Sequence, residues 1–422
     1  MRFSYAAARP KKGKPSGVQG RKPRQTSINS STPGAHAGTY CGTAFIIAAT
    51  RRRLIDRSIP ASSSVPAKRN FSPIGVAPTL AGLLALDNPG DAARAGNGER
   101  LGDVGAMIAN SAHNAHGDSD DGRPYFLAPS DLQALKACGV TFVRSMLERV
   151  IEEQAKGDPE QAAEIRDAIG AEIGASLADV VPGSDEAARI KGVLTERGLW
   201  SQYLEVGIGP DAEIFTKSQP MAAVGIGAEI GIHPNSTWSN PEPEVVLAIA
   251  PSGNIVGVTL GNDVNLRDFE GRSALLLGKA KDNRASCAVG PFIRLFDDAF
   301  NLNHVRDMHI SLSVTGTDGF ALQGTSSLAE ISRDLGDLAA YARGPHNHFP
   351  DGLLLFTGTM FAPTEDRDTP GQGFTHHLGD IVTIANPLLG SLTNQVNHTD
   401  KIPQWTFGIG ALMANLAGRG LL

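Results

Sequence analysis

The chain has 422 residues, of which 41% are hydrophobic, so it can bury one large core or two smaller ones. No stretch approaches the ~20 consecutive apolar residues of a membrane span, and we expect no membrane partner. The net charge is −6, but residues 1–70 hold fourteen Lys and Arg against the single acid Asp56, a balance of +13. The rest of the chain therefore carries −19. This acidic part argues against nucleic acid as a partner.

Residues 1–70 are rich in Arg, Lys, Ser, Pro and Gly, which predicts a disordered basic leader. Their only apolar run, residues 44–49, is shorter than the apolar core of a secretory signal, so we expect no signal peptide. An organellar transit peptide and an extension from an early start codon remain alternatives. The three cysteines, Cys41, Cys138 and Cys287, lack metal-ligand spacing and cannot form a disulfide framework. They indicate a reducing compartment, and we expect a cytoplasmic protein.

Residues 71–197 predict a mainly helical N-terminal region. A short buried helix is expected at residues 78–86. Apolar residues at three-to-four spacing predict a second helix over residues 130–151, although Gly139 could interrupt it. Further helices are expected to start near Asp158 and Ser184.

Two polar clusters in this region could have functional roles. His113 and His116 share the polar loop predicted at residues 110–124 with three aspartates, and a solvated loop is favoured over a second metal site. Glu148 and Glu152 would share a helix face, where solvated side chains are favoured over an acid/base pair.

Residues 198–422 change in texture to strands, loops and glycines. They predict a catalytic domain with a mixed β structure, so the predicted fold class is α+β, with a mainly helical segment in front. Strands are expected at 309–314, 353–357, 381–384 and 390–394, and a helix at 327–343.

A β-hairpin is predicted within this domain. Residues 245–249 and 255–260 are β-branched and aliphatic runs separated by Pro-Ser-Gly-Asn. If Ser252 and Gly253 form the loop, the numbers of paired residues sum to 505. Glu242 then lies opposite Asp263, and Glu244, two residues from Glu242, shares its face.

Three carboxylates that converge in this way repel one another unless a cation lies among them. Oxygen ligands suit a hard ion, so Mg²⁺ or Mn²⁺ is favoured over Zn²⁺, and Ca²⁺ is an alternative. A solvated hairpin edge with scattered acids is the other interpretation, and a one-residue bulge would move Asp263 off the shared face.

The motifs PEPEVV, GNDVNLRD and GKAKDNRASCAVGPF resemble the metal-binding core of the fumarylacetoacetate hydrolase family. The resemblance implies a roll-like β domain, a homodimer, and a metal held by Glu242, Glu244 and Asp263. It also implies that a lysine faces the substrate. The distance to Gly290-Pro291 favours Lys281 for this role, and Lys279 is the alternative. A T-G-T element followed by Gly379-Asp380 implies that Thr359 lies near the substrate.

Within the family, the chain is more similar to the sugar-acid dehydratase branch. That resemblance implies that Glu213 is the acid/base. Lys217, four residues further along a strand, would share its face and either lower the pKa of Glu213 or meet a substrate carboxylate. Arg267 could order the site or bind the substrate carboxylate.

The resemblance implies dehydration of a 2-keto-3-deoxy-pentonate, derived from xylose or arabinose, to 2-oxoglutarate semialdehyde. The alternative is hydrolysis of a carbon–carbon bond in a fumarylacetoacetate- or acylpyruvate-type substrate. The chain lacks a clear His-x-x-Glu pair, and GKAKDNRASC replaces the G-K-S-F-D-T-like sequence of many hydrolases. Both departures favour the lyase, while a metal-stabilised binding protein is a third hypothesis.

Overall fold

The structure is a computed structural model. It describes residues 77–95, 103–115, 125–142, 146, 150, 180–196, 198, 200–361, 365–368 and 373–422. All of these belong to the compact unit Gly42–Leu422. Three predicted features lie outside the described residues: the leader at residues 1–70, the acids at positions 118–121, and the helix expected to start at Asp158.

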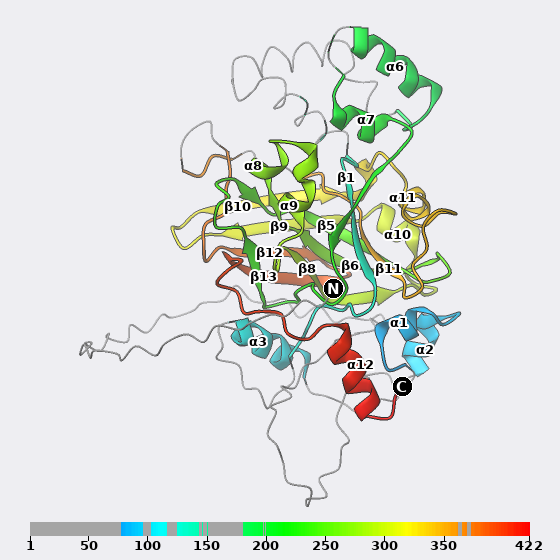
Figure 1. Cartoon of the computed structure of the whole chain (residues 1–422), viewed down its shortest axis with the longest axis vertical. Helices are drawn as coiled ribbons and strands as arrows, with labels where there is room; N and C mark the ends of the chain where they lie inside the picture. Colours follow the sequence, from blue (N-terminus) through cyan, green and yellow to red (C-terminus); the bar gives the residue numbers. More distant parts are fainter. Residues whose placement is uncertain are drawn as a thin grey trace, which may run out of the picture. The chain divides into compact units, whose positions relative to one another are not determined.

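The larger sheet has six strands in the order β2-β1-β11-β5-β6-β8 (Figure 1). Its members are β1 (Ala134–Gly139), β2 (Glu213–Ser218), β5 (Pro243–Ile249), β6 (Ile255–Asp263), β8 (Cys287–Leu295) and β11 (Leu353–Phe356). β1 and β11 run parallel, and the other neighbours are antiparallel.

The second sheet has five strands in the order β10-β9-β12-β13-β3. Its members are β3 (Glu229–Ile232), β9 (His309–Thr315), β10 (Ala321–Ser327), β12 (Ile381–Asn386) and β13 (Gly390–His398). β9 alternates buried and more exposed side chains, as predicted for a half-buried strand. A short ladder pairs β4 (Ser239–Asn240) with β7 (Asn265–Leu266).

The described helices are α1 (Leu80–Leu84), α2 (Pro89–Ala95), α3 (Val104–Ala115), α6 (Asp185–Glu196), α7 (Gln202–Ile208), α8 (Arg267–Glu270), α9 (Leu277–Lys281), α10 (Leu302–Arg306), α11 (Leu335–Ala342) and α12 (Ile409–Gly418), with 3₁₀ turns at Ala274–Leu276 and Leu328–Glu330. In the described part of the chain, none is both long and apolar enough to cross a bilayer. The fold is α+β, as predicted.

Every residue of β5 is buried, because both of its faces are covered. Val245 and Leu247 pack in one apolar cluster with residues of the five-stranded sheet such as Leu312. Val246 and Ala248, which point the other way, pack in a second cluster with residues of α1 and α2. The strand that leads out of the Glu-x-Glu motif is therefore held between two layers of the core.

The helix predicted over residues 130–151 is wrong in its first half. Residues 134–139 form β1, between β2 and β11. A short apolar run fits a helix or a buried strand equally well, and here pairing with residues about 80 and 220 positions later decides the outcome. The region predicted as mainly helical thus supplies an internal strand to the main sheet. The loop predicted from residue 110 is also wrong at its start, because α3 continues to Ala115.

Candidate metal centre and active site

The β5–β6 hairpin has the predicted register at its acidic end. Pro243 pairs with Asn262 and Glu244 with Gly261, and both pairs sum to 505. The N–H of Asp263 donates to the carbonyl of Glu242 at 3.0 Å. The register shifts only next to the loop, beyond Ala248, so the irregularity does not reach the acids.

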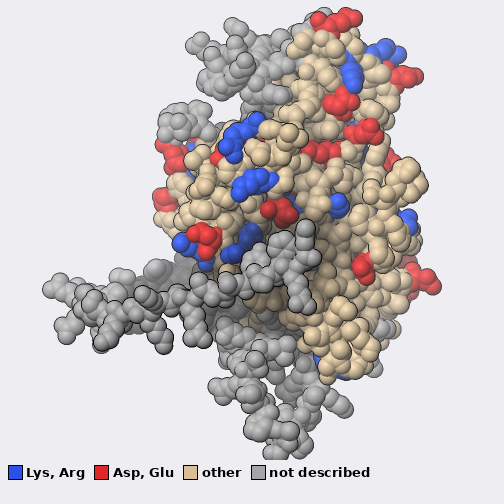
Figure 2. Space-filling view, viewed as in Figure 1, with Lys and Arg blue, Asp and Glu red and all other residues tan. Residues whose placement is uncertain are grey.

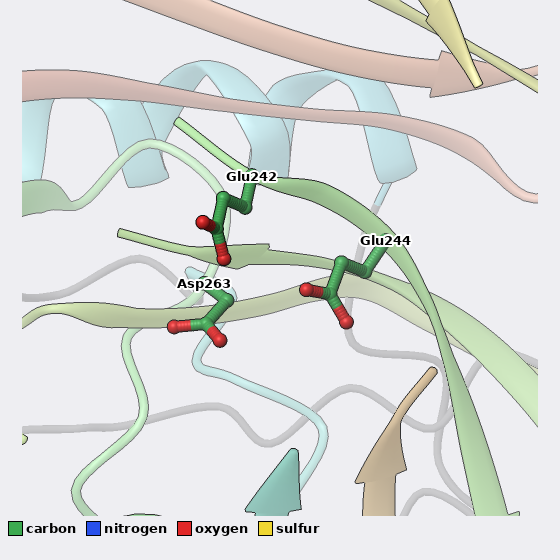
Figure 3. Close-up of side chains that lie close together, drawn as sticks. All are labelled: Glu242, Glu244 and Asp263. Carbon is green, nitrogen blue, oxygen red and sulfur yellow. The ribbon is translucent and has the colours of Figure 1, made fainter. Parts of the chain in front are cut away.

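The three acids converge in a buried cluster. One carboxylate oxygen from each of Glu242, Glu244 and Asp263 lies within 4.8 Å of the other two. Their exposed fractions are 4%, 1% and 1%. Figure 3 shows the three carboxyl groups directed toward a common space from two neighbouring strands. Because every donor is a carboxylate oxygen, the cluster fits a hard divalent cation.

Burial and like charge make this cluster costly without a cation. Burial raises the pKa of Glu244 well above its ordinary value, and the charges of Asp263 and Glu242 raise it further. Opposing effects come from Lys281 and from the Gly358 N–H, which donates to Glu244 Oε2 at 2.7 Å. Gly358 has φ +90°, a conformation that favours glycine in the T-G-T loop.

Two buried lysines partly balance the acids. Lys281 Nζ lies 2.5 Å from Glu242 Oε2 and 3.3 Å from Asp263 Oδ2, and Lys217 Nζ lies 2.7 Å from Asp263 Oδ1. Asp263 Oδ1 nevertheless accepts no hydrogen bond of good geometry within the described residues. With all groups ionised the cluster keeps one formal negative charge, so both the charge and the oxygen donors fit a divalent ion.

The structure distinguishes the two candidate lysines of the GKAK segment. Lys281 reaches the acids, whereas Lys279 lies on the outer side of α9, with Nζ 3.0 Å from His233 Nε2. Residues 279 and 281 are two positions apart on a helix and so point in different directions.

Lys217 is placed differently from the expectation. It is fully buried and donates to the carbonyls of Val264 and Lys281, with Ser286 Oγ at 3.5 Å. The pairing of β2 with β1 shifts at this point and leaves Lys217 without a partner in the register. Its ammonium therefore meets Asp263, a candidate metal ligand, and not a surface open to substrate.

A small cavity of about 20 Å³ is lined by two of the three acids and by other expected residues. Its lining contains Glu213 and Thr359 beside Glu242, Glu244 and Lys281. The other lining residues are Cys138, Gly139, Val140, Phe215, Glu270, Leu277 and Gly358. A cavity of this size takes an ion or a water, whereas organic ligands occupy pockets of ~300 Å³ or more. A larger cavity of about 730 Å³ contains none of these residues, and the chemistry favours the small one.

Cys138 lines the cavity but is a poor nucleophile. Burial raises the pKa of its thiol well above the ordinary value, and the carboxylates of Glu244 and Glu213 add to the effect. The reactive form of cysteine is the thiolate, so this thiol stays protonated and inert near neutral pH.

Sequence reasoning missed Asn265 and Glu270. Asn265 Nδ2 donates to Glu242 Oε1 at 3.0 Å and to Glu270 Oε2 at 2.5 Å, and Glu270 lines the cavity. Both residues follow Asp263 closely in the chain, within or just after GNDVNLRD. The only sign that Glu270 could reach the site was its position soon after β6, where a short turn and helix return the chain to the site.

Arg267 lies on α8, with its guanidinium 4.2 Å from the centre of the Trp238 ring. Arg272 and Lys279 lie 4.6 and 5.7 Å from the centre of the Phe269 ring. In Figure 2, Lys and Arg side chains gather over the region of α8 and α9, the elements that wall the small cavity. Basic side chains therefore gather on the outer face of that wall.

The part of the chain that forms the sheets and the acidic centre is similar to one known family. Residues 199–397 match the fumarylacetoacetate (FAA) hydrolase C-terminal family. The match spans 199 of the 422 residues. The candidate metal-site residues Glu242, Glu244, Asp263 and Lys281 all fall within it.

Two relatives have named activities. Over 190 residues the chain is 30% identical to 2-dehydro-3-deoxy-D-arabinonate dehydratase of Saccharolobus solfataricus. These residues are 45% of this chain and 60% of that protein. Over 201 residues it is 29% identical to the probable 2-keto-3-deoxyxylonate dehydratase of Haloferax volcanii, 48% of this chain and 65% of that one. The chain thus matches less than two thirds of the length of either.

Solved structures support the fold. A 2-keto-3-deoxy-D-arabinonate dehydratase complexed with magnesium and 2,5-dioxopentanoate aligns with a TM-score of 0.50 at 22% identity, over 72% of this chain and 83% of that one. The apo form of that dehydratase aligns over the same shares with a TM-score of 0.51. At this identity the likeness establishes the shared fold.

Proposed function

We propose that the chain is a metal-dependent hydro-lyase that dehydrates a 2-keto-3-deoxy-pentonate to 2-oxoglutarate semialdehyde. The observation that carries the proposal is the buried set of Glu242, Glu244 and Asp263, of which the two glutamates line a small cavity together with Lys281 and Glu213. The two named relatives are described as dehydratases of the arabinose- and xylose-derived substrates, which supports this reaction over others on the same fold.

The three carboxylates would hold Mg²⁺, with Mn²⁺ or Ca²⁺ as substitutes. When bound, the ion supplies Lewis-acid chemistry, polarising the keto group and stabilising negative charge on its oxygen. Magnesium is present in the structure of the dehydratase that shares this fold. Asn265, which donates to Glu242, fixes the orientation of that carboxylate.

The protein's own groups would handle the substrate and its protons. Lys281 and Thr359, which line the cavity, would contact the substrate at the metal once the cavity widens from about 20 Å³ to admit it, Lys281 by its positive charge against the carboxylate or the developing enolate. Glu213 removes a proton from C3 and returns it to the hydroxyl leaving C4, so one water departs and a C3–C4 double bond forms. Two proton shifts then move hydrogen from C5 and its hydroxyl to C3 and C4, which yields the aldehyde.

Lys217 and Arg267 have roles at a greater distance. Lys217 holds Asp263 and the backbone after Lys281 in place, since its ammonium bonds both. Arg267, Arg272 and Lys279 give the wall of the cavity a positive outer face that attracts an anionic 2-keto acid. Arg267 could also bind the carboxylate of this substrate directly.

Product analysis tests the reaction. The chain with Mg²⁺ is incubated separately with 2-keto-3-deoxy-xylonate, 2-keto-3-deoxy-arabinonate and an acylpyruvate, and products are identified by proton NMR. We expect 2-oxoglutarate semialdehyde from one or both pentonates. Pyruvate from the acylpyruvate, with both pentonates untouched, would mean a carbon–carbon bond hydrolase, and no turnover of any substrate would leave a binding protein.

We also propose that the enzyme works as a homodimer in the cytoplasm. Family resemblance supports the dimer, and the scarcity of cysteine supports a reducing compartment. Light scattering of the purified chain tests the first statement, and fractionation of the source cells tests the second. A monomer at working concentration, or recovery in an oxidising compartment, would contradict them.

A further inference from the structure

Glu213 and Gly139 face each other across two neighbouring strands. They form the last pair of the antiparallel β1–β2 ladder, and both line the small cavity. Directly opposed residues of an antiparallel pair project their side chains on the same face. The Glu213 side chain uses the space that a side chain on residue 139 would otherwise fill.

The contact between the two residues is very close. A Cβ placed on Gly139 would lie 1.8 Å from Glu213 Oε2 and 2.6 Å from its Cδ. The three atoms nearest to such a Cβ all belong to the Glu213 side chain. Gly139 does not have a positive φ, so its backbone would accept an L side chain. The need for glycine at this position therefore comes from the Glu213 carboxylate.

The backbone on both sides of this pair is fixed. Before Glu213, the buried Arg333 donates to the carbonyls of Val206, Gly209 and Asp211 at 2.7–3.3 Å. After Gly139, Thr141 Oγ1 donates to the carbonyl of Thr357 at 2.7 Å, which ties the end of β1 to the T-G-T loop. Neither strand end can shift to make room, so only the glutamate side chain can move.

We propose that Gly139 is a positioning residue, whose missing side chain provides the seat that holds the Glu213 carboxylate in the cavity. The inference rests on the proposed function, in which Glu213 moves the protons. Alanine at position 139 would push the carboxylate out of this seat and leave the strands paired, because the colliding atoms are the far end of a flexible side chain.

The test is a double-mutant cycle of Gly139→Ala and Glu213→Gln, assayed for dehydration of the pentonate that the wild type uses. Misplacing a reacting group by about 1 Å lowers turnover by roughly 100-fold, so we expect a loss of this order in kcat for Gly139→Ala, with KM little changed. In the Glu213→Gln background the same substitution should cause no further loss, because it acts through the carboxylate.

Two further measurements separate positioning from damage to the fold or to the metal site. The melting temperature and the dissociation constant for Mn²⁺ should match the wild type in Gly139→Ala, since neither depends on the Glu213 carboxylate. Gly192→Ala is the matched control, because a Cβ there meets no atom within 4 Å, and it should retain full activity.

The outcomes distinguish this inference from the proposed function. Wild-type kcat in Gly139→Ala would overturn the inference, as would a loss that multiplies with Glu213→Gln or a weakened affinity for Mn²⁺. A Glu213→Gln enzyme as active as the wild type would instead remove Glu213 from the mechanism. Absence of pentonate turnover in the wild type would reject the reaction itself.

Discussion

Glu244→Gln should remove the metal and at the same time stabilise the metal-free protein. The substitution replaces a charged ligand by a neutral one of nearly the same shape, and the amide oxygen can still accept from the Gly358 N–H. Two carboxylate oxygens within 4.8 Å of each other repel by roughly 3.5 kcal/mol or more at an effective dielectric constant of about 20. The two lysines relieve part of this, and we expect a net gain of about 1–2 kcal/mol in the free energy of unfolding.

The pH dependence of the stability difference provides a second test of this prediction. The folded-state pKa of Glu244 is raised above its model value of 4.5, so the unfolded chain ionises first as the pH rises. Metal-free wild type therefore loses stability relative to Glu244→Gln above about pH 4.5, and the difference levels off once Glu244 is ionised in the folded state too. Below pH 4.5 the two proteins should converge.

Differential scanning calorimetry in EDTA measures the effect, which for a chain of 422 residues corresponds to an increase of roughly 1–2 °C in melting temperature near pH 7. Adding Mg²⁺ should raise the melting temperature of the wild type and not that of Glu244→Gln. Glu330→Gln, at an exposed 3₁₀ turn, controls for charge alone. A metal-free variant less stable than wild type near neutral pH would refute the repulsion argument, and retained Mg²⁺ binding would refute the ligand assignment.

Three other changes have defined outcomes. Lys281→Met should lower kcat by at least 100-fold while the chain still binds Mn²⁺ in calorimetry; near-normal turnover would remove Lys281 from the reaction. Asp380→Asn should destabilise by roughly 3–5 kcal/mol in urea, since Asp380 forms a buried ion pair with Arg367 at 2.6 Å. Burial alone would raise the pKa of Asp380, but hydrogen bonds from Arg367, His376 and the His377 N–H lower it below its ordinary 3.8. The stability that the ionised carboxylate contributes is therefore present above pH 3.8 and is lost on further acidification. An unchanged acid transition in the variant would contradict this. Deletion of residues 1–69 should leave kcat and KM unchanged, and an inactive truncation would give the leader a role.

The hairpin could be predicted because its determinants are local. A turn signal fixes the register, and alternation along a strand then places Glu242, Glu244 and Asp263 on one face. β1 could not be recognised in the same way, since its partners β2 and β11 come much later in the chain. The roles expected for Glu213, Lys281 and Thr359 came from family resemblance, and spacing alone would not have selected them.

Lys217 and Glu270 show two further limits. The ion pair of Lys217 with Asp263 was not predicted, and it occurs where the β1–β2 ladder is irregular. A bulge of this kind depends on how two strands meet and leaves no clear trace in one of them. Glu270 reaches the cavity because α8 turns back after β7, which requires the three-dimensional path of the chain.

The small volume of the cavity has a kinetic consequence. An ion held among these carboxylates is enclosed by strands of the main sheet on one side and by α8 and α9 on the other. It can leave only when this enclosure opens, so a chelator in solution competes for an ion that is released at a fixed rate. Inactivation by EDTA should then approach a limiting rate at high chelator concentration, and that limit would measure how often the wall around the metal centre opens.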